Sequence, residues 1–426
     1  MAKLLVNGGH RLSGEVTIGG AKNSTVALIP ASILSDTEVI FDSVPNILDV
    51  QNLQMILAAM NVSSDFQNSI LKIDPTKIVE APLPTNAIKS LRASYYFMGA
   101  LLGRFHKAVV TFPGGDNIGP RPIDLHIKGF RALGATVTEE GDTIILEAKG
   151  GLKGANIFFD TVSVGATMNL ILAAVRAKGT TILENAAKEP EIIDLVTFLN
   201  NMGANIRGAG TDTIRISGVQ SLQSVAAHTT IPDRIEAGTY LSLAAAIGDG
   251  VTIKNIIPEH LESFTAKMIE SGVRLEVLED QIFVPKTEKI KPIVITTAPF
   301  PGFATDLQQP ISSLLLRAEG ESTVIDTIYP KRVRHVAELR KLGADINSPM
   351  EGMVKINNSP NLVGNEVRAA EIRAGASLLV AALMAEGQTT IEEAHHILRG
   401  YDSVEHKLTK LGADVKVIDS DKIELM

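Results

Sequence analysis

Six basic residues of this chain stand where an element is expected to begin or a loop to be tight, and their side chains could bind anions. Lys22 lies in the glycine-rich run I-G-G-A-K-N-S, which leads into a helix. The others are five arginines: Arg92, Arg121, Arg332, Arg373 and Arg399. Helix starts and guanidinium groups both favour phosphates and carboxylates. Taken singly, each residue is more often a surface salt-bridge partner, but their recurrence at corresponding element ends indicates a pocket for anionic ligands.

Two aspartates could act as acid or base beside these cations. Asp116 lies in the segment 113–122, which holds three Gly and three Pro in ten residues. This segment is either an ordinary surface loop with Asp116 as a turn residue, or a lid whose glycines permit closure. Asp306 lies in P-G-F-A-T-D-L-Q-Q-P. The preferred interpretation of this residue is a helix N-cap, and the alternative is a catalytic base.

The same residues exclude several other kinds of site. The Lys22 loop lacks the Gly-Lys-Ser/Thr ending of a P-loop, and no G-x-G-x-x-G follows an expected strand. His395, His396 and His406 do not have the spacing of metal ligands. The absence of Cys excludes disulfides, thiolate zinc sites, iron–sulfur clusters and a cysteine nucleophile. We therefore expect neither a metal nor a cofactor.

The composition excludes further classes of protein. The 426 residues include 40 Lys and Arg against 48 Asp and Glu, a net charge of −8, which argues against nonspecific nucleic-acid binding. The N-terminal apolar run is too short for a secretory signal. The longest apolar runs, such as 376–385, have about ten residues, whereas a membrane span needs about twenty. We expect a soluble cytoplasmic protein that has no nucleic-acid or membrane partner.

The same pattern of expected elements occurs six times along the chain. A helical pattern ends at Asn61, Gly134, Gly203, Gly272, Gly343 and Gly412, which are 69 to 73 residues apart. Gly and Asn most readily accept the left-handed conformation of a helix C-cap. Two short strands are expected after each cap, and a second, more apolar helix precedes a further strand. Each repeat thus predicts helix, strand, helix, strand, strand.

The apolar helices of the repeats, such as those around 239–247 and 376–385, have almost no polar face. Such helices belong inside a domain, with the sheets outside them. The pattern therefore predicts an α/β fold. Unrelated amphipathic helices in a common α/β fold remain the alternative.

Seven motifs in order give the chain a family resemblance. They are G-A-K-N-S, P-G-G-D-N-I-G-P-R-P-I-D-L-H, S-V-G-A-T, N-A-A-K-E-P-E-I, P-D-R-I-E-A-G-T, F-A-T-D-L-Q and L-R-G-Y. Together they resemble the bacterial UDP-N-acetylglucosamine enolpyruvyl transferases over essentially the whole chain. The resemblance implies an inside-out α/β barrel of two domains, each with three β-α-β-α-β-β repeats. The implied domains are 22–229 and 1–21 plus 230–426, with the active site in the cleft between them.

The resemblance also implies a reaction, transfer of enolpyruvyl from phosphoenolpyruvate to the 3-hydroxyl of UDP-N-acetylglucosamine with release of phosphate, the first committed step of peptidoglycan synthesis. It assigns the phosphoenolpyruvate phosphate to Lys22, Arg121 and Arg399, and the carboxylate side to Arg332 and Arg373. Asn23 contacts the reacting oxygen, and Asp306 is the candidate base. The residues that match the family's contacts with the nucleotide sugar are Arg92, Arg121, Pro122, Ile123, Asp124, Leu125, Ser163, Val164, Asp306 and Ile328.

Asp116 departs from the family pattern, because many members have Cys at this place. The resemblance assigns that residue protonation of C3 or a part in product release. With Asp116 we expect turnover to rise toward mildly acidic pH and the antibiotic fosfomycin to form no covalent adduct. Two other functions stay open: an enolpyruvyl transferase with another acceptor, such as shikimate phosphate, and a catalytically silent paralogue that binds nucleotide sugar.

Overall fold

The sixfold repeat of the sequence is present in the computed structural model, which describes residues 2–81, 83–112 and 123–418. The predicted left-handed conformation is confirmed at all six helix ends. The φ angles are 59° at Asn61, 93° at Gly134, 102° at Gly203, 90° at Gly272, 91° at Gly343 and 96° at Gly412. Two strands follow each of the first five caps, and the predicted second strand after Gly412 lies outside the described residues.

The described residues form two compact units. One comprises residues 2–19 and 232–418, and the other comprises 20–112 and 123–231, without residue 82. The N-terminal segment thus pairs with strands from the C-terminal half of the chain, and the chain passes between the units near residues 19–20 and 231–232.

The first unit contains three four-stranded sheets, with the orders β21-β22-β1-β23, β15-β16-β14-β2 and β17-β18-β20-β19. The strands are β1 (Lys3–Asn7), β2 (Leu12–Thr17), β14 (Gly248–Lys254), β15 (Glu276–Val277), β16 (Gln281–Val284), β17 (Val294–Thr296), β18 (Ser322–Ile325), β19 (Ile346–Met350), β20 (Met353–Ile356), β21 (Glu366–Arg368), β22 (Gln388–Glu392) and β23 (Asp414–Ile418). In each sheet one outer pair is parallel and the other pairings are antiparallel. β1 and β2 therefore complete two repeats whose remaining elements follow Pro232.

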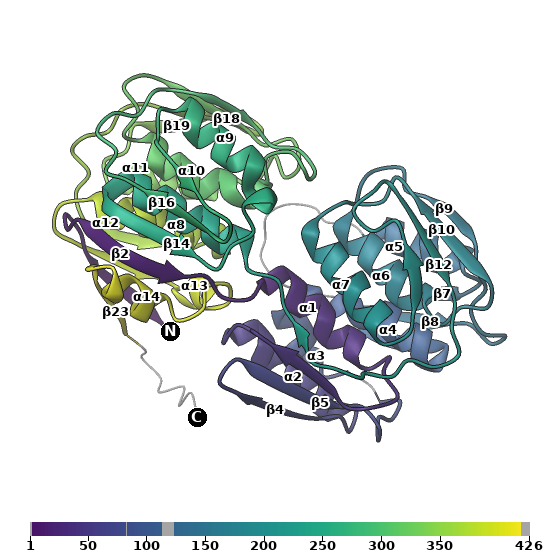
Figure 1. Ribbon diagram of the computed structural model, residues 1–426. Coiled ribbons are helices and arrows are strands. Elements are labelled where there is room, and N and C mark those ends of the chain that lie inside the picture. Colours follow the sequence, from purple (N-terminus) through teal and green to yellow (C-terminus); the bar gives the residue numbers. More distant parts are fainter. Residues whose placement is uncertain (1, 82, 113–122, 419–426) are drawn as a thin grey trace. The chain divides into compact units, whose positions relative to one another are not determined.

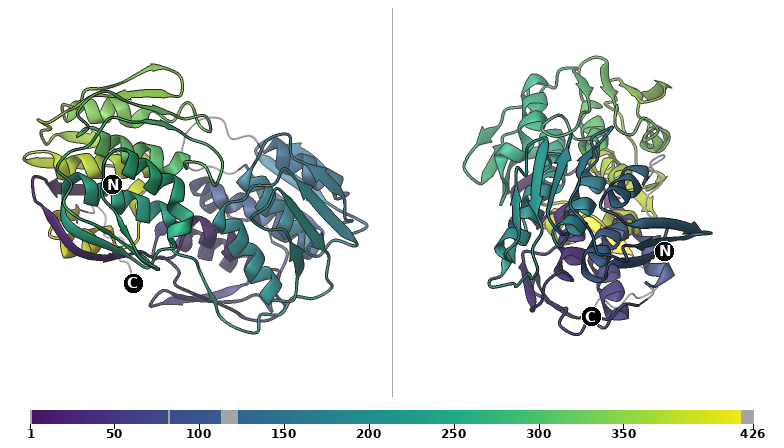
Figure 2. Two further views of the ribbon diagram at one scale, coloured as in Figure 1. Left: turned by 45° about the horizontal axis from the view of Figure 1, so that its top comes forward. Right: turned by 90° about the vertical axis from the view of Figure 1, so that its right-hand side faces the viewer.

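The first unit also contains helices, three of which are almost completely buried. The helices are α8 (Arg234–Ile247), α9 (Glu262–Glu270), α10 (Gln308–Leu315), α11 (Arg334–Lys341), α12 (Ile372–Met384), α13 (His395–Leu398) and α14 (Val404–Lys410), with short 3-10 turns η2 (Pro258–Leu261) and η3 (Thr305–Leu307). Nearly every residue of α8, α10 and α12 is buried, and these three helices contact one another. Figures 1 and 2 show them on the inner side of the sheets, as the apolar patterns predict.

The second unit repeats this plan. Its strands are β3 (Val39–Asp42), β4 (Ser63–Gln67), β5 (Ile70–Asp74), β6 (Lys107–Thr111), β7 (Thr136–Glu140), β8 (Thr143–Glu147), β9 (Asn156–Phe158), β10 (Thr180–Glu184), β11 (Asn205–Arg207), β12 (Thr213–Ser217) and β13 (His228–Thr229). Its helices are α1 (Lys22–Ser32), α2 (Leu48–Ala59), α3 (Thr85–Ser90), α4 (Tyr96–Phe105), α5 (Asp124–Ala132), α6 (Val164–Ala174) and α7 (Pro190–Asn201), with the 3-10 turn η1 (Arg92–Tyr95). The inner helices are α1, α4 and α6, and they share one hydrophobic core.

One sheet of the second unit differs from the other five. The order β6-β8-β7 has three strands among the described residues, whereas β11-β12-β10-β9 and β13-β3-β5-β4 have four. The first, parallel strand of this repeat would precede α4. The described part of the segment at that place contains Pro84, and proline has no N–H to donate to a neighbouring strand.

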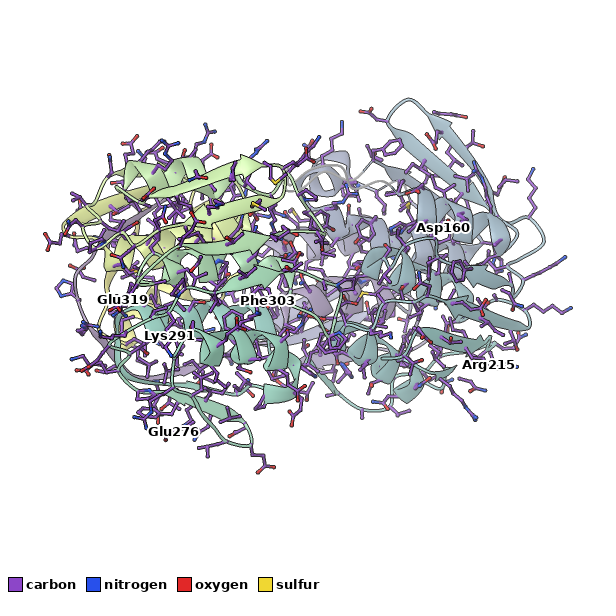
Figure 3. The ribbon with its side chains drawn as sticks, turned by 90° about the horizontal axis from the view of Figure 1, so that it is seen from above. Asp160, Arg215, Glu276, Lys291, Phe303 and Glu319 are labelled. Atoms are coloured by element: carbon purple, nitrogen blue, oxygen red, sulfur yellow. The ribbon has the colours of Figure 1, made fainter. Side chains whose placement is uncertain are left out.

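Charged side chains are exposed on both units. Glu276, Lys291 and Glu319 are exposed in the first unit, and Asp160 and Arg215 in the second (Figure 3). Phe303, labelled in the same view, is buried in the core of the first unit.

Candidate active site

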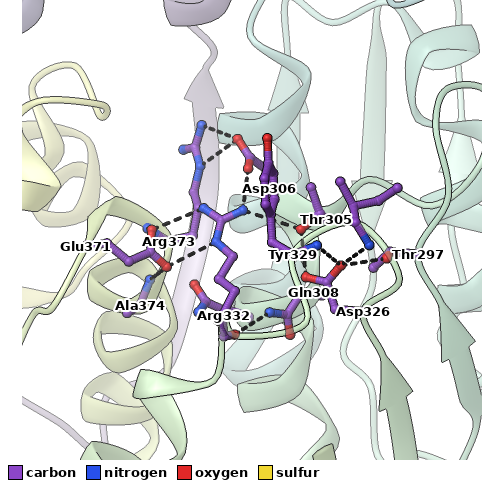
Figure 4. Close-up of polar contacts among 12 residues, drawn as sticks. Thr297, Thr305, Asp306, Gln308, Asp326, Tyr329, Arg332, Glu371, Arg373 and Ala374 are labelled. Atoms are coloured by element: carbon purple, nitrogen blue, oxygen red, sulfur yellow. Dashed lines mark hydrogen bonds and ion pairs between the residues drawn. The ribbon is translucent and has the colours of Figure 1, made fainter. Parts of the chain in front are cut away.

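Two acidic and two basic side chains of the first unit form one group, here called the Asp306 cluster: Asp306, Arg332, Glu371 and Arg373 (Figure 4). Asp306 lies on η3, Arg332 lies just before α11, and Glu371 and Arg373 lie at the start of α12. The Asp306 Oδ1 atom accepts a hydrogen bond from Arg332 Nη1 at 2.6 Å, and Oδ2 accepts from Arg373 Nε at 3.2 Å. The structure therefore brings together three of the predicted site residues.

The prediction that Asp306 is a helix N-cap is wrong. Ala304 precedes η3 and Leu307 precedes α10, and neither helix start has a side-chain cap. The Asp306 carboxylate instead faces two guanidinium groups, and hydrogen bonds between charged partners are stronger than a bond from a backbone N–H.

Glu371 holds both arginines of the cluster. Its carboxylate accepts from Arg332 Nε at 3.3 Å and from Arg332 Nη2 at 3.1 Å. It also caps α12, accepting from the backbone N–H of Arg373 at 2.9 Å and of Ala374 at 3.0 Å. The motif E-I-R-A-G-A-S contains this residue, but only Arg373 was predicted from it. An acidic residue directly before an apolar helix was the signal that could have identified the cap.

A third carboxylate, Asp326, shapes the loop beside the cluster. Its Oδ1 atom accepts from the backbone N–H groups of Ile328 and Tyr329, both at 3.0 Å, and from Thr297 Oγ1 at 2.8 Å. Its Oδ2 atom accepts from Thr305 Oγ1 at 2.7 Å. Asp326 thus links Ile328, a predicted nucleotide-sugar contact, to the residue that precedes Asp306.

The two arginines are fully ionised in this setting. Burial would by itself lower the pKa of Arg332, but Glu371 and Asp306 more than offset it, so the pKa lies above its ordinary value. Burial likewise lowers the pKa of Arg373, and Tyr401 and Asp306 raise it further than burial lowers it. Arg332 is 5% exposed and Asp306 is 25% exposed. A ligand could therefore reach the carboxylate, while the arginines stay fixed.

Arg399 lies at the end of the short helix α13, two residues before Tyr401, and is half-buried. The Tyr401 ring centre is 5.4 Å from the Arg373 guanidinium carbon, and the Tyr401 hydroxyl is 2.9 Å from Thr239 Oγ1. The loop after α13 therefore packs against the Asp306 cluster.

Lys22 and Asn23 are the first two residues of α1 in the second unit, as predicted. The Lys22 Nζ atom lies 3.1 Å from Asp49 Oδ2, and the Asp49 side chain is completely buried. A buried carboxylate at this distance orients the ammonium group of Lys22. The next residue, Ser24, donates to Asp194 at 2.5 Å, and Asp194 also lies 2.8 Å from His228 Nε2. These contacts hold the first turn of α1 in place.

A second group in this unit surrounds Arg92, the first residue of η1. Its guanidinium carbon lies 5.9 Å from the centre of the Tyr95 ring, which meets the His126 ring edge-on at 5.0 Å. The His126 Nδ1 atom lies 3.0 Å from Asn169 Nδ2, which can donate to it. Burial and the Arg92 charge lower the pKa of His126 to about 3, so the imidazole is neutral at pH 7. Sequence reasoning missed His126, although it ends the motif I-D-L-H.

Several of the residues predicted to bind the nucleotide sugar lie next to this group, at the starts of α6 and α5. Ser163 caps α6 through its hydroxyl, which accepts from the Ala166 N–H at 3.2 Å, and Val164 begins the helix. A Cβ atom on Gly165 would lie 2.6 Å from the Tyr95 hydroxyl and 3.2 Å from His126 Cε1. Ile123, Asp124 and Leu125 lie at the start of α5, directly before His126. Helix starts carry partial positive charge, which favours anions.

Three predicted site residues, Asp116, Arg121 and Pro122, lie outside the described residues. Within the ranges that the structure describes, no three His, Asp or Glu side chains are grouped so that they could hold a metal ion. None of the described helices is both long and apolar enough to cross a membrane.

Comparison with known proteins places the chain among enolpyruvyl transferases. A family model described as EPSP synthase (3-phosphoshikimate 1-carboxyvinyltransferase) matches residues 6–408. A Lactiplantibacillus plantarum protein named UDP-N-acetylglucosamine 1-carboxyvinyltransferase 2 is 64% identical over 424 residues, which cover 99% of each chain. A Streptococcus pyogenes protein of the same name is 56% identical over 420 residues, 98% of this chain and all of that one.

Solved structures agree with this placement. The enolpyruvyl transferase NikO from Streptomyces tendae has a TM-score of 0.89 at 26% identity and covers 99% of both chains. EPSP synthase from Acinetobacter baumannii has a TM-score of 0.73 at 17% identity over 98% of this chain, a likeness of fold alone. The predicted two-domain α/β fold is confirmed.

Proposed function

Because the chain belongs to the EPSP synthase family of enolpyruvyl transferases, we propose that it transfers the enolpyruvyl group of phosphoenolpyruvate to the 3-hydroxyl of UDP-N-acetylglucosamine and releases phosphate. The observation that carries the choice of acceptor is the 64% identity, over 99% of both chains, to a protein named for this sugar nucleotide. The likeness to EPSP synthase, at 17% identity, does not favour shikimate phosphate as acceptor.

The reaction is an addition followed by an elimination. The sugar oxygen bonds to C2 of phosphoenolpyruvate, its proton passes to a base, and C3 gains a proton. The tetrahedral intermediate then loses a proton from C3 and phosphate from C2, which restores the double bond. The two substrates bring about five negative charges, so fixed cations must offset their repulsion.

The first unit supplies a base and two cations to this scheme. In the proposal Asp306 takes the proton of the sugar hydroxyl, and Arg332 and Arg373 bind the carboxylate of phosphoenolpyruvate. That carboxylate would compete with Asp306 for the N–H donors of the same two arginines, which lie 2.6 and 3.2 Å from Asp306 oxygens. Losing hydrogen bonds to its ionised form makes a carboxylate a better base. Binding of phosphoenolpyruvate would thus prepare Asp306 for its role.

The remaining predicted site residues, which come from both units, complete the assignment. Lys22, Arg121 and Arg399 bind the phosphate of phosphoenolpyruvate, and Asn23 contacts the reacting oxygen. Arg92, Ser163 and Val164 bind the nucleotide sugar together with residues 121–125 and Ile328. The helix starts at Val164 and Asp124 suit the pyrophosphate, because their N–H groups attract anions. Asp116 is assigned to C3 protonation.

A role in the cell belongs to the same proposal. The product would enter peptidoglycan synthesis, and the enzyme would act in the cytoplasm and support cell-wall growth and division.

Asp116 in place of the alkylated thiol would make the enzyme insensitive to fosfomycin. Incubation with fosfomycin followed by mass spectrometry tests this: we expect the unmodified mass for the wild type and an adduct for Asp116→Cys, and an adduct on the wild type would contradict it.

Phosphate release from phosphoenolpyruvate tests the proposed function. We expect release when UDP-N-acetylglucosamine is present and none when it is omitted. Release with shikimate 3-phosphate but not with the sugar nucleotide would identify the other acceptor. Binding of the sugar nucleotide without any release would identify a catalytically silent paralogue.

A further inference from the structure

The Glu371 carboxylate is the shared support of both arginines of the Asp306 cluster. It is 1% exposed, and each of its oxygens accepts two hydrogen bonds: one from the Arg332 side chain and one from the first turn of α12. Figure 4 shows Glu371 on the side of Arg332 that faces away from Asp306. A carboxylate in this position has no free oxygen with which to contact a substrate.

Arg332 is held at its backbone as well as at its side chain. Its carbonyl oxygen accepts from Gln308 Nε2 at 3.0 Å and from Gln309 Nε2 at 3.3 Å. Glu371 occupies the edge of the guanidinium formed by Nε and Nη2, and this leaves Nη1 for Asp306. Because a guanidinium is planar and rigid, binding one edge fixes the direction in which the remaining N–H groups point.

Arg373 depends on Glu371 through the helix that carries it. Its backbone N–H donates to Glu371, and its side chain donates to Asp306 through Nε. Its Nη1 atom is buried and has no hydrogen-bond partner within the described part of the chain. A buried donor of this kind is costly unless a ligand supplies an acceptor. The start of α12 therefore presents a donor whose place is set by the Glu371 cap.

We infer that Glu371 is a positioning residue for the binding of phosphoenolpyruvate, an inference that rests on the proposed function. Glu371 sets the direction of Arg332, anchors the turn that carries Arg373, and offsets one of the two positive charges. Without it, Arg332 could turn and pair with Asp306 through two N–H groups, as arginine and carboxylate commonly do. That pairing would withdraw both the cation and the base from the substrate.

The inference predicts a selective effect on one substrate. In Glu371→Gln, which keeps the size of the side chain and removes its charge, the KM for phosphoenolpyruvate should rise by about 10- to 100-fold, the range expected when a hydrogen-bonded charged group is lost. The KM for UDP-N-acetylglucosamine should rise by no more than about threefold, because Arg332 and Arg373 have no assigned contact with this substrate and, of the cluster, only Asp306 has one. Glu371→Asp, which keeps the charge and the capping oxygen, should recover part of the lost affinity.

Glu236→Gln is the matched control. Glu236 is as deeply buried in the same unit, lies in the first turn of the inner helix α8, and accepts from Lys407 Nζ at 2.6 Å and from the Gly19 N–H at 2.9 Å. We expect it to lower the melting temperature and to leave the KM for phosphoenolpyruvate unchanged. All variants are assayed by phosphate release, and their melting temperatures are measured.

The outcomes separate the inference from its premise. An equal rise in both KM values, an unchanged KM for phosphoenolpyruvate, or the same selective rise in Glu236→Gln would overturn the inference while the proposed function stands. Absence of phosphate release by the wild type would overturn both. If Glu371→Gln does not fold, Glu371→Asp decides: a selective rise in the KM for phosphoenolpyruvate supports the inference, and none overturns it.

Discussion

Asp306 faces two guanidinium groups, and this contact gives the sharpest prediction for a single residue. Asp306→Asn removes the proposed base, so kcat should fall by about 100- to 10,000-fold, the usual contribution of general acid–base catalysis. Asp36 is the matched control, because it accepts from Arg104 Nη1 and Arg176 Nη2, both at 2.9 Å, at a similar exposure. Asp36→Asn should lower the melting temperature and leave kcat within about twofold. Equal losses of kcat in both variants would mean that Asp306 has only a structural role.

The carboxyl group of Asp116 predicts how turnover depends on pH, whatever its place in the structure. A free Asp has a pKa near 3.9, so about one side chain in a thousand is protonated at pH 7, whereas Cys, near 8.5, is mostly protonated. If Asp116 protonates C3, turnover should rise toward mildly acidic pH, and Asp116→Cys should shift the optimum toward higher pH. The pH profiles of kcat for the two proteins decide this. A wild-type optimum at or above that of the variant would refute it.

At the scale of elements, the glycines that end the amphipathic helices in the left-handed conformation should lose folding stability when they are replaced by alanine. Gly134 has a φ of 93°, and a Cβ atom added there would meet nothing within 4 Å, so only backbone strain opposes a side chain. Gly134→Ala should therefore destabilise the fold by about 1 kcal/mol. Gly150→Ala is the control, because that site is equally open and its φ is not in the left-handed range. Equal unfolding midpoints for the two variants would contradict the strain argument.

The helix α11 carries a buried His335 whose titration affects stability. Burial and the Arg332 charge lower the pKa of this residue to about 3, against 6.5 in an ordinary setting. Between about pH 3 and pH 6.5, His335 therefore binds a proton in the unfolded chain but not in the folded chain. The contribution of His335 to stability is complete above about pH 6.5 and is lost as the pH falls toward 3, at about 1.4 kcal/mol per pH unit.

His335→Gln should remove this dependence while it keeps a polar partner for Gln309, whose Nε2 atom lies 3.2 Å from His335 Nδ1. Between pH 7 and pH 5 the melting temperature of the variant should fall less than that of the wild type. Parallel curves for the two proteins would show that His335 is protonated in the folded state.

At the scale of the whole molecule, local signals could be predicted from the sequence and long-range pairings could not. The six left-handed helix ends follow from single residues, and the inner helices follow from their apolar patterns. The contact of Glu371 with Arg332 joins residues 39 positions apart, and that of Asp306 with Arg373 joins residues 67 apart. The packing of η3 with α10, and of α10 and α11 against α12, brings such residues together. The same limit explains the wrong N-cap prediction for Asp306, whose partners are distant in the chain.

The placement of the N-terminal strands shows the same limit. Nothing in the repeat pattern says that β1 pairs with β22 and β23 or that β2 pairs with β14. The family resemblance implied only that residues 1–21 belong with the C-terminal half of the chain. His126 and Asn169 were missed because their role depends on the approach of η1, α5 and α6, which is set by tertiary packing.

The central claim is that the three carbons of phosphoenolpyruvate become attached to UDP-N-acetylglucosamine. The most direct measurement is mass spectrometry of the nucleotide sugar after incubation of the wild-type protein with both substrates, with the phosphoenolpyruvate labelled with carbon-13. The account predicts that the sugar nucleotide gains one labelled enolpyruvyl group for each phosphate released. Phosphate release with an unmodified sugar nucleotide, or no conversion of either substrate, would contradict it.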